Sequence, residues 1–271
     1  MITKKSTVTR RLCESAIMIA LATILSLLKL VDLPYGGSIT LASMLPILII
    51  AYRHGTAWGI LTSTVHGAMQ FILGTSVLSY VTGWMSVCAV IVFDYVLAFS
   101  LIGLGGIFKN MKSQRGGLVL GALTASAARY LCHFISGVTV WRDISIPGGA
   151  AVVYSLSYNA TYMIPETIVL CAAAYYIASC LNFKSLALTP IKRGEKDRSP
   201  VLTYLKGATL IATLVFDVAI VFSKLQNADT GSFDITGLAK VNFPLLLIVS
   251  ASGTALFTIF SLIPKFARKM S

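Results

Sequence analysis

The chain has 271 residues, of which 56% are hydrophobic and only 12% charged, and its mean hydropathy is +0.82. A soluble domain needs more charge than this to cover its surface, so the composition excludes an ordinary soluble protein. The formal net charge of +12 does not indicate nucleic-acid binding, because most Lys and Arg residues lie in short loops between apolar segments, as membrane topology requires.

Apolar segments long enough for helices recur along the whole chain. A helix that spans the bilayer needs roughly 20 apolar residues, and backbone groups in lipid must bond to one another, which favours helices over open strands. The second segment is short, and we expect it to be tilted or covered by its neighbours. The fold class is therefore an all-α membrane protein, with the lipid bilayer as its solvent and helices over 12–31, 39–52, 57–73, 84–108, 117–139, 151–182, 202–222 and 243–263.

Basic residues set the predicted orientation. Lys4, Lys5, Arg10 and Arg11 precede the first apolar run, which lacks a small-x-small cleavage site, so we interpret this run as a retained helix rather than a signal peptide. Placing the N-terminus inside puts most Lys and Arg residues on the cytoplasmic side. With eight helices, the C-terminus is then cytoplasmic as well.

The segment 184–200 is polar, basic and proline-containing, and it reads as a cytoplasmic linker. It divides a six-helix core, residues 1–183, from a two-helix C-terminal extension, residues 201–271. No internal repeat is evident, which weakens the case for a secondary transporter built from inverted repeats.

Ionisable side chains within spanning helices are costly and mark functional sites. Asp94 requires a cation, which is either Arg129 in an ion pair or a cationic ligand, and both can hold. Arg129 and His133 are four residues apart and share a helix face. We interpret Glu166, which follows a proline, as structural, and Asp217 has no evident partner.

Aromatic and polar side chains gather near the predicted outer ends of the fifth and sixth helices. A single Trp or Tyr there is typical of the interfacial belt. Together with Asp94, however, Trp141, Tyr154 and Asn159 form a candidate aromatic box with a carboxylate. Such a box suits a flat cationic heterocycle through stacking and cation–π attraction.

Motifs for chemistry are absent. The sequence has no GxxxxGK[ST], HExxH or GxSxG motif, and its five cysteines form no CxxC pair. We therefore expect no cofactor and no enzymatic activity.

Four stretches in order resemble a known family over roughly residues 10–182. They are Pro34-Tyr-Gly-Gly-Ser-Ile-Thr40, Asp94-Tyr-Val-Leu-Ala-Phe99, Arg129-Tyr-Leu-Cys-His133 running on to Trp141, and Tyr154 to Pro165. Together these stretches resemble the thiamine-specific substrate-binding (S) subunits of energy-coupling factor (ECF) transporters, the ThiT/YuaJ family.

The resemblance implies a six-helix protein of the bacterial cytoplasmic membrane that captures thiamine from outside and performs no chemistry on it. It also implies a partner, an energising module of two ATPases and a transmembrane coupling protein. Ala16 and Ala20 look like the small-residue motif of the first helix that contacts the coupling protein. The residues that look like ligand-binding positions are Asp94, Tyr95, Arg129, His133, Trp141, Tyr154, Asn159 and, in the first external loop, Tyr35.

Two alternatives stay open on the sequence. The chain is an S subunit for another vitamin or a thiamine precursor, or it is an ion-coupled secondary transporter that acts alone. The two C-terminal helices depart from the six-helix pattern, and the resemblance says nothing about them.

Overall fold

The computed structural model describes residues 4–33, 36–141, 151–185, 188–191, 200–225 and 235–270. The chain forms two compact units, Met1–Thr189 and Pro190–Ser271. Their boundary falls within the predicted linker 184–200, most of which lies outside the described residues. The division into core, linker and extension stays a prediction.

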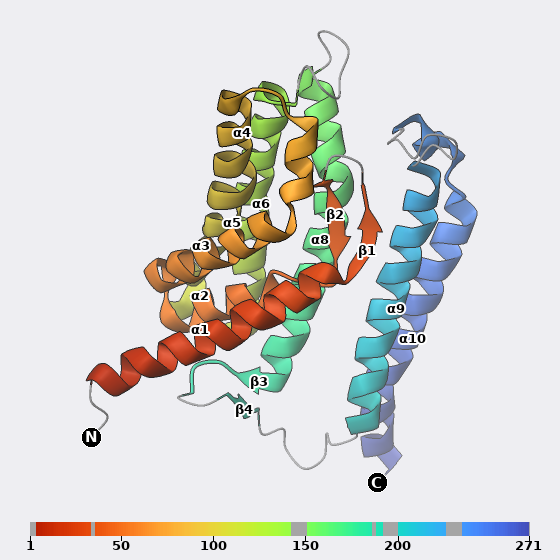
Figure 1. Cartoon of the computed structure of the whole chain (residues 1–271). Coiled ribbons are helices and arrows are strands. Elements are labelled where there is room, and N and C mark those ends of the chain that lie inside the picture. The colour runs from red at the N-terminus through yellow and green to blue at the C-terminus, as the bar shows by residue number, and fades with distance from the viewer. Residues whose placement is uncertain are drawn as a thin grey trace. The chain divides into compact units, whose positions relative to one another are not determined.

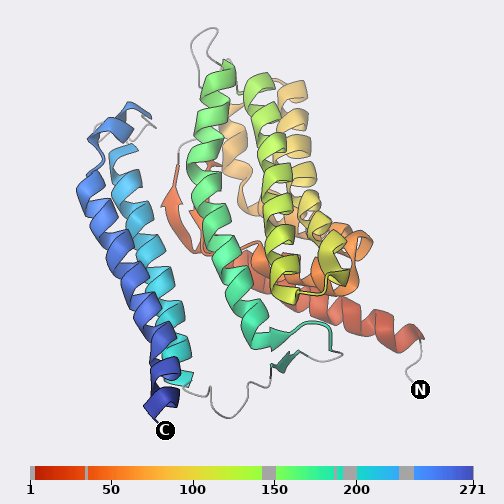
Figure 2. The same cartoon turned by 180° about the vertical axis from the view of Figure 1, so that it is seen from behind.

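The first unit is a helical bundle. In Figure 1, α4, α6 and α8 run roughly parallel and α1 lies obliquely to them, while Figure 2 shows α6 and α8 side by side over much of their length. One long helix, Trp84–Asn110, is built from four labelled parts. The helices are α1 (Lys4–Leu27), α2 (Leu45–His54), α3 (Thr56–Leu73), η2 (Thr75–Tyr80), α4 (Trp84–Val90), η3 (Ile91–Leu97), α5 (Ala98–Ser100), η4 (Leu101–Asn110), α6 (Gln114–Thr139) and α8 (Ala151–Cys180).

The second unit is a helical hairpin of α9 (Pro200–Leu225) and α10 (Phe243–Met270), preceded at α10 by the short helix η7 (Ile235–Lys240). The two helices approach closely at Gly253, where a β-carbon would collide with the side chain of Thr213. Asp217, which lacked a partner on the sequence, accepts a hydrogen bond from Ser250 Oγ at 2.8 Å.

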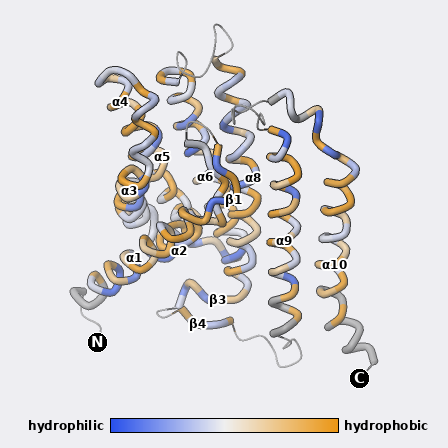
Figure 3. Tube along the Cα trace, turned by 45° about the vertical axis from the view of Figure 1, so that its right-hand side comes forward, coloured by the Kyte–Doolittle hydropathy of each residue, from blue (hydrophilic) through white to orange (hydrophobic). Residues whose placement is uncertain are grey.

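Five helices within the described residues are long and apolar enough to cross a membrane, so the chain is a multi-pass membrane protein. They are Trp84–Asn110, Gln114–Thr139, Ala151–Cys180, Leu205–Leu225 and Phe243–Phe260. Hydrophobic residues predominate along α10 and most of α9 in Figure 3. A helix occurs in each of the eight apolar segments, and the short second one, α2, is buried from Pro46 to Tyr52, as expected.

The structure is mostly helical, and it departs from the predicted all-α pattern between the first two helices. The expected helices 12–31 and 39–52 extend into β1 (Lys29–Asp32) and β2 (Ser38–Thr40), which pair antiparallel with Asp32 opposite Ser38. Gly36, at φ +95°, occupies a left-handed conformation that few other residues adopt, and this lets the chain reverse. Two further short strands, β3 (Leu181–Asn182) and β4 (Thr189–Pro190), also lie outside the predicted pattern.

Close helix contact and one charge cluster hold the bundle around the site. A β-carbon at Gly103 would collide with the backbone of Gly59 and Ile60, so η4 packs directly on α3. At the C-terminal end of α2, Arg53 and His54 donate hydrogen bonds to the Glu14 carboxylate of α1. These contacts fix the position of α1 against the rest of the first unit.

Candidate ligand-binding site

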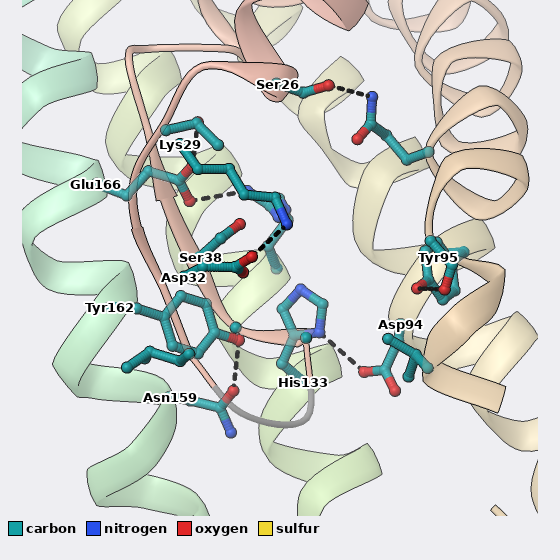
Figure 4. A pocket seen from close by; sticks show the side chains of 18 of the residues that line it. Ser26, Lys29, Asp32, Ser38, Asp94, Tyr95, His133, Asn159, Tyr162 and Glu166 are labelled. Atoms are coloured by element: carbon teal, nitrogen blue, oxygen red, sulfur yellow. Dashed lines mark hydrogen bonds and ion pairs between the residues drawn. The ribbon is translucent and has the colours of Figure 1, made fainter. Parts of the chain in front are cut away.

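A cavity of about 440 Å³ lies inside the first unit, between α6, α8, the η3–α5 part of the long helix and the β1–β2 hairpin. Figure 4 shows Asp94 on one wall and Tyr162 and Asn159 on the facing wall, with His133 between them. The sequence-predicted residues that line this cavity are Asp94, Tyr95, Arg129, His133, Trp141, Tyr154 and Asn159. Tyr35, the eighth, lies outside the described residues.

Asp94 is held by three hydrogen-bond donors. His133 Nδ1 lies 2.8 Å from its Oδ1, while Ser136 Oγ at 2.6 Å and Trp141 Nε1 at 3.4 Å donate to its Oδ2. Of the two partners that the sequence left open for Asp94, Arg129 is not the one it meets, because the Arg129 guanidinium is directed to Glu166. Because a carboxylate accepts, His133 Nδ1 carries the proton of this hydrogen bond.

The helix that carries Asp94 and Tyr95 is irregular at this point. Both residues lie in η3, a π-helical segment, and single π-turns inside α-helices occur frequently at functional sites. Tyr95 stacks on Phe99, with ring centroids 6.5 Å apart, and its hydroxyl donates to the Gly74 carbonyl oxygen at 3.1 Å. This wall of the pocket is therefore aromatic next to a carboxylate.

The facing wall is formed by a row of ring-to-ring contacts between Tyr154, Tyr158 and Tyr162 of α8, which we call the tyrosine ladder. Tyr154 stacks on Tyr158 at 6.0 Å between centroids, and Tyr158 meets Tyr162 edge-on at 5.7 Å. Tyr158 and Tyr162 were not among the predicted site residues, although both line the cavity. Their four-residue steps from Tyr154, continued to Glu166, place all four on one helix face, and this signal was present in the sequence.

Asn159, which is only 4% exposed, is satisfied within α8. Its Nδ2 donates to the Ser155 carbonyl oxygen at 2.9 Å, and its Oδ1 accepts from the Tyr162 hydroxyl at 2.7 Å. The amide is thus oriented by its neighbours, with its free acceptor lone pair on Oδ1 as its remaining capacity for a ligand.

A second buried carboxylate reaches the cavity. Glu166 Oε1 accepts from Thr40 Oγ1 at 2.7 Å, and its Oε2 lies 3.5 Å from Arg129 Nη1. The interpretation of Glu166 as a purely structural residue missed that it lines the same cavity as Asp94.

The β1–β2 hairpin closes one side of the cavity. The Gly37 backbone N–H donates to the Tyr158 hydroxyl at 3.2 Å, which joins the hairpin to the tyrosine ladder. Lys29 pairs with Asp32 at 2.9 Å, and both line the cavity. The sequence had suggested a loop residue over the ligand here but not a hairpin.

Ala16 and Ala20 lie away from the cavity. Both are exposed on α1, one turn apart, beside exposed apolar residues such as Leu12, Ile17 and Ile24.

Residues 12–185 match the family model described as "Thiamine transporter protein (Thia_YuaJ)". This match covers more than half of the chain. The chain belongs to the thiamine transporter family.

Two curated relatives agree with this assignment. The thiamine transporter ThiT of Bacillus subtilis is 33% identical over 185 residues, which cover 64% of this chain and 90% of the relative. The thiamine transporter ThiT of Lacticaseibacillus paracasei is 30% identical over 166 residues, which cover 54% of this chain and 75% of the relative.

A solved structure of ThiT from Listeria monocytogenes is similar in fold. It superposes with a TM-score of 0.53 at 23% identity, covering 64% of this chain and 94% of that chain. A member of the thiamine transporter family is a transporter rather than an enzyme, in agreement with the expectation from the sequence. The α9–α10 hairpin lies outside the residues that match the family model.

Proposed function

We propose that this member of the thiamine transporter family binds thiamine in the Asp94 cavity and acts as the substrate-binding subunit of an ECF-type uptake transporter. One observation carries the proposal. A carboxylate whose hydrogen-bond partners are His133, Ser136 and Trp141 lies between two aromatic walls in a cavity of about 440 Å³.

The charges around the cavity favour a cation. Three carboxylates line it, those of Asp32, Asp94 and Glu166, against two permanent cations, Lys29 and Arg129. Lys29 pairs with Asp32 and Arg129 with Glu166, whereas Asp94 has no permanently charged partner among the described cavity residues and is paired with the His133 imidazole. A thiazolium ring supplies a permanent counter-charge, because a buried anion is stable only with a compensating partner.

The aromatic walls suit the two rings of thiamine. Trp141, the tyrosine ladder and Tyr95 offer flat faces for stacking and for cation–π attraction. His133 Nε2 and the Asn159 amide offer polar atoms to ring and side-chain substituents. Charge-assisted hydrogen bonds contribute about 1.5–3 kcal/mol each, and several with stacking reach nanomolar affinity, about −12 kcal/mol.

The remaining parts of the proposal concern the membrane and the partner. The six apolar helices of residues 1–183 form the S-subunit bundle, and α9 and α10 are two additional spanning helices. Both termini are cytoplasmic, in accordance with the distribution of Lys and Arg. Ala16 and Ala20, exposed on α1, contact the coupling protein of an energising module with two ATPases.

Titration of the purified protein tests the function. Thiamine is expected to change the fluorescence of Trp141 saturably, with the same affinity by calorimetry, and the W141F variant should lose the fluorescence signal. No heat and no saturable change would refute thiamine binding. A panel that includes thiamine precursors and riboflavin separates the alternative vitamins. Uptake into proteoliposomes driven by an ion gradient without ATPases would favour a secondary transporter.

A further inference from the structure

The cavity also contains a buried charge pair whose role is not explained by cation binding. Arg129 is 6% exposed and Glu166 is 4% exposed, and both line the cavity. Figure 4 shows Glu166 and Asp32 turned toward the pocket. A buried arginine at a ligand cavity is the group that best recognises a phosphoryl anion, so its pairing decides which ligands the cavity accepts.

The Glu166 carboxylate is held in place from the hairpin side. Thr40 Oγ1 donates to Oε1 at 2.7 Å, and the Ser43 hydroxyl lies 2.7 Å from the same Thr40 oxygen. Because the Thr40 proton is used on Glu166, Ser43 donates to Thr40. This chain of hydroxyl groups fixes the carboxylate, which leaves Oε2 directed to Arg129.

The Arg129 guanidinium does not use all of its N–H donors in hydrogen bonds among the described residues. It lies 4.7 Å above the Phe99 ring and close to the Met44 sulfur, and its Nε, buried, has no hydrogen-bond partner among the described residues. An arginine carries five N–H donors, and here the contact to Glu166 is a single one of 3.5 Å. Without the Glu166 charge, this group would be an unoccupied anion site.

We infer that Glu166 is a specificity-determining residue, which neutralises Arg129 and thereby keeps phosphate esters of the ligand out of the cavity. The inference rests on the proposed function, because it specifies that the substrate is unphosphorylated thiamine, a cation with a free hydroxyl group. A phosphate ester brings a charge of about −1.5 to −2. Lys29 and Arg129 are the cations among the described cavity residues, and each is already paired with a carboxylate. The carboxylate of Asp94, which has no permanently charged partner, repels the ester further.

Calorimetry of the full chain with thiamine and with thiamine monophosphate tests this. The wild-type protein is expected to prefer thiamine. In E166Q, which keeps the shape and frees the guanidinium, the ratio of the two dissociation constants should move toward the phosphate ester by about tenfold or more, the effect of one charge-assisted hydrogen bond. An unchanged ratio in folded E166Q overturns the inference.

Two further variants keep the test decisive. R129Q/E166Q removes both charges and should restore the preference for thiamine, because no freed guanidinium is left to bind a phosphate. This double variant is expected to fold, since replacing both partners of a buried ion pair by neutral groups is close to neutral for stability. E166D withdraws the carboxylate by one methylene and should move the ratio in the same direction as E166Q, by less. If E166Q does not fold, the ratio in E166D decides: a shift supports the inference and no shift overturns it.

D32N is the matched control. It frees the other cavity cation, Lys29, from a pair that is half exposed, so the ratio should change by less than about threefold. A change as large as in E166Q would mean that any freed cation suffices, and Glu166 would have no special role. Absence of thiamine binding by the wild-type protein would instead refute the proposed function, so the two failures are distinguishable.

Discussion

Asp94 and Glu166 both reach the same cavity, but their partners differ in charge. Glu166 is paired with the Arg129 guanidinium and is held by the Thr40 hydroxyl, so its charge is compensated within the protein. Asp94 is held by an imidazole, a hydroxyl and an indole N–H, none of which carries a permanent charge. The difference indicates that hydrogen bonds fix both carboxylates in place, whereas only the uncompensated charge is available to a cationic ligand.

The largest expected effect comes from removing that uncompensated charge. D94N should weaken thiamine binding by about 100-fold, because the ligand cation loses its counter-charge while the amide keeps a similar shape. Calorimetry of D94N and of E166Q in the same detergent makes the comparison direct. If E166Q lost as much affinity for thiamine itself as D94N, the assignment of the two carboxylates would be wrong.

The second-largest loss of thiamine affinity is expected from the aromatic side chain next to Asp94, Trp141. W141A removes both a stacking face and the weak donor to Asp94, and we expect about a tenfold loss of thiamine affinity. W141F, which keeps a ring, should lose less. Equal losses in the two variants would mean that stacking on Trp141 contributes nothing.

A smaller effect is expected where the hairpin meets the tyrosine ladder. Y158F leaves the Gly37 N–H without its acceptor, and loss of one neutral hydrogen bond should lower thiamine affinity by about fivefold at most. The matched control is Y175F, which removes a hydroxyl from an exposed tyrosine of the same helix that does not line the cavity. Its affinity should equal that of the wild-type protein.

The smallest effect should come from the second unit. G253L forces a side chain into Thr213 and disturbs the α9–α10 contact, but the cavity is formed by the first unit alone. Thiamine affinity should stay within about twofold of wild type, as for independent sites. A larger loss would show that the C-terminal hairpin contributes to the site.

The sequence predicted the helices because apolar length is a strong signal in membrane proteins. It also singled out Asp94, Arg129 and His133, since ionisable groups are rare in such helices. The pairing of these groups was not predictable. Which carboxylate meets Arg129 depends on the rotation and depth of three helices, and apolar length carries no information on either quantity.

Two local features were missed for different reasons. The β1–β2 hairpin has strands of only four and three residues, and their apolar residues Leu30, Val31 and Ile39 continue the apolar runs of the neighbouring helices, so the strands were interpreted as parts of those helices. The tyrosine ladder, in contrast, had a readable signal in its four-residue spacing, but each tyrosine alone is typical of the interfacial belt.

The π-turn at Ile91–Leu97 has a consequence for how this helix tolerates length changes. A π-turn is equivalent to one extra residue in an α-helix, so deleting an exposed residue such as Val92 would restore regular backbone bonding. It would also turn the Trp84–Val90 end by about 100° relative to the rest of the helix. A helix shortened in this way would be more regular, but its N-terminal end, which begins at Trp84, would present a different face to the bundle. The extra residue of the π-turn therefore sets the rotation between the two ends of this helix, at the point where Asp94 lies.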